Sequence, residues 1–422
     1  MTLGTAASPM ASKLQPTARA HPRQGQEVAE DGADTLYHEV ASLRGAMFLF
    51  ALWPIHSGER GMARASVLSH STCYTVLVYA VWSVFNVRTL AARWTALGSA
   101  AAADGGGGDG SGASDLNTRL VNLIVLALLA HHWLLPVAIW PEAATLAKYF
   151  NDWTAFQVEW FEVTGQPLEL RVHARALASA AVGVAFPALL ILLMVQAGES
   201  PAQAAALFPP LCFFFLVGGV WSTLCRAVET SARRLREAFH AERELGVVGN
   251  LGVRRLRAYG LLWLRLRALA ARAGAAQSGT LLVYTVYSMA LGLVASIGVL
   301  VALLHADLGR ANSVQALFLV ESLHHIYTVH DAGHKAAQAA ANALRYEMLC
   351  VKSPAKDGGE MDTEVRTLIM ATEMHQGGPQ PQHASVISLG GFAAVSRSSM
   401  IEVYNILLIN LLVLLQFAYF VY

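Results

Sequence analysis

Residues 280–304, TLLVYTVYSMALGLVASIGVLVALL, form a long and predominantly apolar run without a charged side chain. A helix needs roughly 20 such residues to cross the hydrocarbon core of a bilayer, so this stretch predicts a membrane span. The composition of the whole chain agrees, because 55% of its 422 residues are hydrophobic, 14% are charged and the mean hydropathy is +0.43. These values predict an all-α membrane protein that crosses the bilayer several times.

Six other segments have the same character and give a prediction of seven transmembrane helices in total. A shorter apolar stretch, Leu43–Ile55, precedes them and predicts an interfacial or re-entrant lead-in helix, because it is too short to span a bilayer. The sixth segment is interrupted by Glu321, His324 and His325. The seven expected spans are Ser69–Leu90, Arg119–Trp140, Val172–Gln196, Leu207–Cys225, Thr280–Leu304, Ser313–His330 and Met400–Tyr422.

The distribution of basic residues predicts the orientation of these spans. The first 35 residues hold no apolar run of signal-peptide length, so we expect the amino terminus to stay in the cytosol. With seven spans the carboxyl terminus is then extracellular. The Lys and Arg residues fall on expected cytosolic segments or their membrane edges, as the positive-inside rule requires, with four exceptions: Arg88, Arg93, Arg119 and Arg310.

Two arginine-rich stretches, residues 231–244 and 253–273, have the apolar periodicity of amphipathic helices. One interpretation is that they pack on each other and on neighbouring subunits as an anchor; the other is that they lie on anionic lipid. The expected organisation is a cytosolic tail (1–42), the lead-in helix with spans one to four (43–225), basic anchor helices (226–279), spans five and six (280–330), a cytosolic helix and loop of the anchor (331–398), and a pore-lining last span (399–422).

The segment 391–417, GFAAVSRSSMIEVYNILLINLLVLLQF, resembles the carboxyl-terminal signature of arthropod gustatory receptors, which are related to insect odorant receptors. That signature has a Gly-Phe pair, an Arg-Ser pair, and an apolar helix that closes on Thr-Tyr, five apolar residues and Gln-Phe. The Thr-Tyr pair is replaced here by Ile409 and Asn410, a departure that favours a divergent, bitter-type receptor. The residues that match in register are Gly391, Phe392, Arg397, Ser398, Gln416 and Phe417.

The resemblance implies a function and an assembly. Such receptors are ligand-gated, nonselective cation channels of four subunits, either a homotetramer or a heteromer with related subunits, and the last helix of each subunit lines one pore. The implied location is the plasma membrane of sensory neuron dendrites, in contact with lipid, and the implied ligand is a small tastant such as a bitter compound or a sugar. The resemblance implies no enzymatic activity, cofactor or nucleic-acid partner. A secondary transporter and a G-protein-coupled receptor are the alternatives.

A glutamine in the last span needs a polar partner, because its amide is costly to bury in hydrocarbon. On a helix, Asn405, Ile409, Leu412 and Gln416 lie within about 40° of one line. If four copies face an axis, we expect Gln416 to form a ring of amides, with Leu412, Val413 and Phe417 as a constriction or as packing behind it. The alternative is a hydrogen bond from Gln416 to a helix of its own subunit.

Polar and aromatic residues within the expected spans are candidates for the ligand pocket, together with His131 and His325. Glu321 and His324, one turn apart, are the expected centre of this group, although a Glu and a His that satisfy each other inside the bundle explain them as well. His330 and His334 have helical metal-ligand spacing but no third ligand, so we expect no metal. The candidate pocket residues are His132, Trp221, Tyr284, Tyr287, Ser288, Glu321 and His324.

Overall fold

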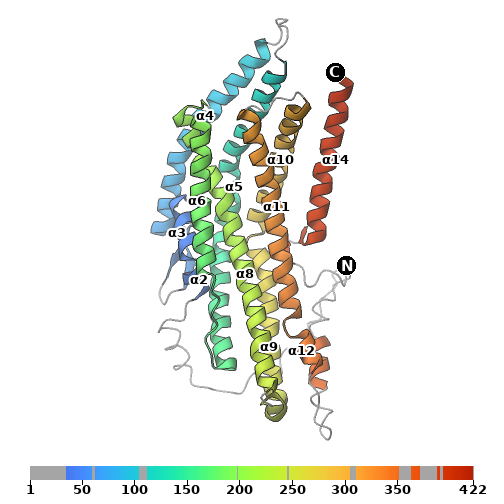
Figure 1. Ribbon diagram of the computed structural model, residues 1–422. Helices are drawn as coiled ribbons and strands as arrows, with labels where there is room; N and C mark the ends of the chain where they lie inside the picture. The colour runs from blue at the N-terminus through green and yellow to red at the C-terminus, as the bar shows by residue number, and fades with distance from the viewer. Residues whose placement is uncertain are drawn as a thin grey trace, which may run out of the picture. The chain divides into compact units, whose positions relative to one another are not determined.

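The computed structural model describes residues 35–58, 62–103, 112–196, 198–244, 247–304, 310–350, 363–370, 387–389 and 393–421. These residues form a helical bundle with two short hairpins (Figure 1). The elements are α2 (Leu36–Glu39), α3 (Ala41–Leu49), β1 (Ile55–Ser57), β2 (Ala63–Ala65), α4 (His70–Ala103), α5 (Gly112–Thr164), α6 (His173–Gln196), α7 (Pro201–Ala206), α8 (Phe208–Glu244), α9 (Val247–Ala276), α10 (Ser278–Leu304), α11 (Arg310–Asn342), α12 (Arg345–Leu349), β3 (Ile387–Leu389), β4 (Ala393–Val395) and α14 (Arg397–Val421).

Helix α8 forms the core of the bundle. Its apolar part is almost entirely buried, and it packs against α6, α9 and α11. Helix α10 packs against α5 and α11, and α14 lies along α10 and α11 (Figure 1). The bundle therefore places α11 between the buried core and the last helix of the chain.

Five helices are long and apolar enough to cross a membrane, and they match the first five predicted spans: His70–Ala96, Arg119–Thr164, His173–Gln196, Pro201–Glu244 and Ser278–Leu303. Helices α4 and α6 expose most of their apolar side chains, as expected of helices that face lipid. The sixth and seventh predicted spans are also helical, in α11 and α14. Within the described residues, neither helix meets the criteria of length, hydropathy and low charge that the other five meet. The total of seven spans therefore remains a prediction.

One predicted helix boundary is wrong. The lead-in helix expected to reach Ile55 ends at Leu49, Ala51 has a φ of 63°, and Ile55 instead begins strand β1. Pro54 explains the early end, because proline disfavours helical backbone in the residue before it and lacks the amide that a helix interior needs. Helix α5 continues past Trp140, the predicted end of the second span, to Thr164 through two internal prolines, so the point at which the chain leaves the membrane stays a prediction.

The arginine-rich stretches are helical, in α8 and α9, and they pack on each other. Arg255 of α9 donates to both carboxylate oxygens of Glu242, at 2.9 Å from Nε and 2.5 Å from Nη2. Trp263 of α9 is buried and donates to the carbonyl of Ala340 in α11 at 2.7 Å. Helix α9 also contacts residues 363–370. Two hydrogen bonds from Arg257 of α9 to the Glu364 carboxylate lower the pKa of that carboxyl. These contacts favour the packed anchor over helices bound to a membrane surface.

Candidate functional site

A chain of polar groups lies inside the bundle, between α10 and α11. The Tyr284 hydroxyl contacts Nδ1 of His325, and Nε2 of His325 lies 3.4 Å from a carboxylate oxygen of Glu321. All three side chains are buried, with 1%, 5% and 6% of their surface exposed. Glu321 and His325 are four residues apart, so they project from one face of α11.

Aromatic rings enclose this polar chain. The ring of Phe214, from α8, lies edge-on to His325 with 4.3 Å between ring centroids. On the other side, His131 of α5 stacks on Tyr287 of α10 at 4.2 Å. Gly218 of α8 makes room for the cluster, because a Cβ at that position would lie 2.9 Å from the Tyr284 hydroxyl. Four helices thus supply the walls of what we call the polar cluster: His131, Phe214, Tyr284, Tyr287, Glu321 and His325.

Several polar atoms of the polar cluster have no hydrogen-bond partner among the described residues. They are both ring nitrogens of His131, the hydroxyl of Tyr287 and Oε2 of Glu321. A buried polar group without a partner costs roughly 1–3 kcal/mol, and the cost is larger where no water can reach it. The cluster therefore offers donors and acceptors, between aromatic faces, to water or to a small polar molecule.

Only part of the expected pocket lies in this cluster. Tyr284, Tyr287 and Glu321 are in it, whereas His324 is exposed and faces Thr328. The histidine beside Glu321 is His325, because a spacing of four residues fits this helix face better than a spacing of three.

The other three expected pocket residues have different neighbours. His132 bonds Ser83 of α4 at 3.0 Å and stacks on Tyr79. Trp221 donates to the carbonyl of Val329 at 2.9 Å, nearer the carboxyl end of α11, and Ser288 donates to the carbonyl of Tyr284 in its own helix. Of these three residues, only Ser288 bonds to a member of the polar cluster, and it does so through the backbone carbonyl of Tyr284 and not through the Tyr284 side chain.

The expected pore face of α14 is exposed in the single chain. Asn405, Ile409, Leu412 and Gln416 are all exposed, as is Val413 beside them. The other amide of this helix, Asn410, donates to the carbonyl of Ile406 at 2.7 Å and thus satisfies itself within the helix. The side chain of Phe417 and the motif residues Gly391 and Phe392 lie outside the described residues.

An ion-pair clamp joins the first turn of α14 to α11. Arg397 donates from Nε and Nη2 to Oδ1 of Asp331, at 3.0 and 2.8 Å, while Lys335 of α11 binds the other oxygen at 2.6 Å. Partial burial acts to raise the pKa of the Asp331 carboxyl, but the hydrogen bonds from Lys335 and Arg397 outweigh it and lower that pKa. Ser398, the other residue of the motif pair, is exposed.

Further contacts reinforce this junction. The Ser399 hydroxyl lies 3.2 Å from Nδ1 of His330, and the Tyr404 hydroxyl donates to the carbonyl of Leu323 at 2.9 Å. Gly333 of α11 lies so close to the strand before α14 that a Cβ would be 2.4 Å from Cγ1 of Val395. Within the described ranges, no group of three or more His, Cys, Asp or Glu residues could hold a metal ion, and His330 instead contacts serine.

Sequence reasoning missed Asp331 as the partner of Arg397, and it missed Ser399. The four-residue spacing of Asp331 and Lys335 was visible, because it is that of a helical ion pair. The link to Arg397 bridges more than 60 residues, and the sequence alone carries no signal for it.

Comparison with known proteins finds relatives among insect gustatory and odorant receptors. No protein-family model matches the chain. It is 26% identical to gustatory and odorant receptor 24 of Anopheles gambiae over 302 residues, which are 69% of this chain and 62% of that protein. It is 21% identical to gustatory and odorant receptor 21a of Drosophila melanogaster over 396 residues, which are 92% of this chain and 82% of that protein.

The fold matches that of the insect olfactory receptor OR5 from Machilis hrabei, solved in complex with eugenol. The TM-score is 0.56 at 11% sequence identity, and the match covers 89% of this chain and 97% of the other. The chain spans 62% of the length of the Anopheles relative, a little under two thirds. These relatives are receptors rather than enzymes. In sequence and in fold the chain is similar to insect-type gustatory and odorant receptors.

Proposed function

We propose that the chain is a subunit of a ligand-gated, nonselective cation channel in the plasma membrane that opens when a small tastant binds. In this proposal four subunits, identical or related, surround one pore lined by α14. The chain crosses the membrane seven times with its amino terminus in the cytosol, and it is expressed in dendrites of sensory neurons. The similarity of the chain to gustatory and odorant receptors supports the proposal.

The observation that carries the proposal is the position of α11. This helix holds Glu321 and His325 of the polar cluster, and one to three turns further on it holds Asp331, which binds Arg397 at the base of α14. A ligand that shifts α11 at the polar cluster therefore moves the base of the pore helix through direct contacts. The exposed face of α14, with Gln416 on it, is then completed by the other three subunits.

The polar cluster supports a small ligand with both donors and acceptors on an aromatic or apolar frame. The hydroxyl of Tyr287 and the ring nitrogens of His131 can form hydrogen bonds with hydroxyl or carbonyl groups. Oε2 of Glu321 can accept a hydrogen bond from a ligand hydroxyl or amine. The rings of Phe214 and Tyr287 give flat contact surfaces. Bitter compounds and sugars both have this chemistry, and we propose a bitter compound first.

The test is whole-cell current in cells that express the chain, alone and with related receptor subunits, against a panel of bitter compounds and sugars. The proposal predicts a cation current that persists when G-protein signalling is blocked. Glu321→Gln and Tyr287→Phe should raise the half-maximal ligand concentration, while His324→Gln should not, because His324 is exposed and outside the polar cluster. Substrate uptake without current would instead indicate a transporter, and a response that needs a G protein would reject the channel.

A further inference from the structure

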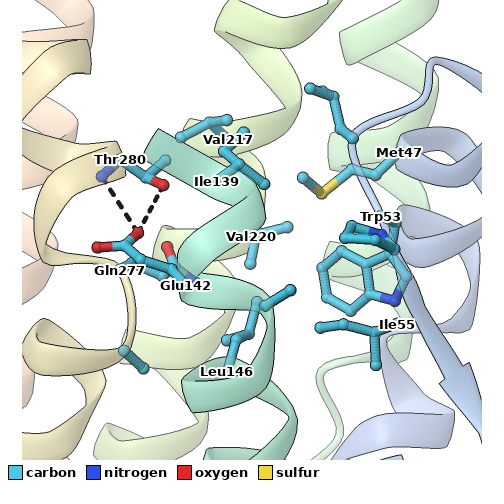
Figure 2. A pocket seen from close by; sticks show the side chains of 14 residues that line it. Met47, Trp53, Ile55, Ile139, Glu142, Leu146, Val217, Val220, Gln277 and Thr280 are labelled. Atoms are coloured by element: carbon cyan, nitrogen blue, oxygen red, sulfur yellow. Dashed lines mark hydrogen bonds between the residues drawn. The ribbon is translucent and has the colours of Figure 1, made fainter. Parts of the chain in front are cut away.

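A cavity lies away from the polar cluster, where Met47 and residues 52–55 meet α5, α8 and the junction of α9 with α10. The centre of a water molecule can move through about 30 Å³ there. That is roughly two to three times the space that one enclosed water needs. Figure 2 shows Met47, Trp53 and Ile55 on one side and Glu142, Gln277 and Thr280 on the other. Of these six, only Glu142 is partly exposed, so the cavity borders the surface at that residue.

The Glu142 carboxylate accepts hydrogen bonds from the first residues of α10. It accepts from the backbone amides of Gly279 and Thr280, the latter at 3.2 Å, and from the Thr280 hydroxyl at 2.7 Å (Figure 2). A second side chain, that of Ser278, donates to the same carboxylate at 3.3 Å. These bonds satisfy the free amides of the first helical turn and use the acceptor capacity of Glu142. The cavity therefore does not present a free negative charge.

Gln277 differs from Glu142. It is the single residue between α9 and α10, its side chain lines the cavity, and only 4% of its surface is exposed. Its Nε2 has no hydrogen-bond partner within the described residues. An amide NH₂ group donates two hydrogen bonds, so the cavity has an unused donor at one end. Met47, Val217, Val220 and Trp53 give an apolar surface around the rest.

We propose that this cavity is a second small-molecule site, which takes a compact neutral molecule of a few heavy atoms with one hydrogen-bond acceptor, such as a short ketone. The acceptor binds Nε2 of Gln277, and the apolar part lies against Trp53, Val217 and Val220. A thioether is adaptable in shape, so Met47 can move to admit the ligand. The site joins the amino-terminal segment to the α9–α10 junction, and binding there does not require that the channel open or that the proposed function be correct.

The experiment measures the midpoint of heat denaturation of the purified full-length protein in detergent as butanone is titrated in. The matched probe is 2-methylbut-1-ene, called methylbutene below, a hydrocarbon of the same shape in which a CH₂ group replaces the carbonyl oxygen. The proposal predicts a saturable rise with butanone and at least a fivefold weaker effect with methylbutene, because one hydrogen bond is lost. Equal effects of the two probes, or no saturable rise with butanone because water alone fills the cavity, would overturn it.

Two variants locate the effect. Gln277→Leu keeps the size of the side chain and removes the donor, so it should weaken butanone at least fivefold and leave methylbutene unchanged. Val220→Phe fills the cavity and should abolish the response to both probes. His324→Gln, at an exposed position on α11, is the control and should respond as the unmodified protein does. Circular dichroism of each variant checks that it is folded, and an unchanged butanone response in folded Gln277→Leu contradicts the proposal.

Discussion

The ion-pair clamp between Arg397 and Asp331 gives the sharpest prediction. If α11 moves α14 through this contact, then weakening the clamp must weaken the link between ligand and current. Arg397→Gln and Asp331→Asn each remove one charge and keep the side chain near its original size. We expect each variant to raise the half-maximal ligand concentration, and the double variant to behave no worse than either single one.

The expected magnitude follows from the exposure of the two partners. Asp331 has only 7% of its side chain exposed, whereas Arg397 has 53%. Charge-assisted hydrogen bonds contribute roughly 1.5–3 kcal/mol when desolvated, and exposed ion pairs about 0.2–1 kcal/mol. This half-exposed pair should therefore contribute about 1 kcal/mol, which corresponds to about a fivefold shift in ligand concentration.

The assay is the ligand concentration–response curve of the whole-cell current, measured for the unmodified chain, both single variants and the double variant. Lys335→Gln is the matched control, because Lys335 binds the same carboxylate from within α11 and makes no link to α14. We expect it to shift the curve less than twofold. Additive shifts in the double variant, or an equal shift in Lys335→Gln, would refute the coupling.

The clamp also has a predicted pH dependence. The pKa of Asp331 is lower in the folded protein than in the unfolded chain, so its stabilisation is complete above the unfolded value and is lost as the pH falls through the folded value. Lowering the cytosolic pH within the neutral and mildly acidic range should therefore leave the clamp intact. If the unmodified chain loses ligand sensitivity between pH 7 and 6 and Asp331→Asn does not, then Asp331 titrates in that range, which would contradict its lowered pKa.

Two further predictions concern packing. Gly333→Ala should raise the half-maximal ligand concentration severalfold, because the new Cβ would meet Val395 at 2.4 Å, while Gly45→Ala, with nothing within 4 Å, should have no effect in the same recording. Glu142→Gln should lower the midpoint of heat denaturation by about 1 °C, since a cap at a helix start contributes about 1 kcal/mol and the entropy of unfolding grows with chain length. An unchanged midpoint would mean that the bonds to Thr280 add nothing.

The helices were largely predictable from the sequence, because the requirement for apolar length leaves a strong local signal. A span and its helix need not end together: α5 runs past the predicted end of the second span at Trp140 to Thr164, and it packs against α9 and α10. The lead-in helix was too long because the effect of Pro54 on the residue before it was not weighed.

The site was less predictable for a geometric reason. Apolar runs show which residues enter the membrane but not which way each side chain points. His324 and His325 are neighbours in the sequence, yet His324 is exposed and His325 is buried. His132 and Trp221 were plausible by composition, but their partners are Ser83 and the carbonyl of Val329. The signature Arg397 was found by resemblance, whereas its partner Asp331 became visible only in the folded chain.

The central claim is that α14 lines a cation pore with Gln416 facing its axis. The most direct measurement is block of the ligand-evoked current by a charged thiol reagent applied from outside, in Gln416→Cys and in Asn410→Cys, with the unmodified chain as reference. Asn410 is the matched control, because its amide bonds within its own helix and lies off the expected pore face. The account predicts rapid block in Gln416→Cys alone. Equal block in both variants, or block in neither despite a robust current, would contradict it.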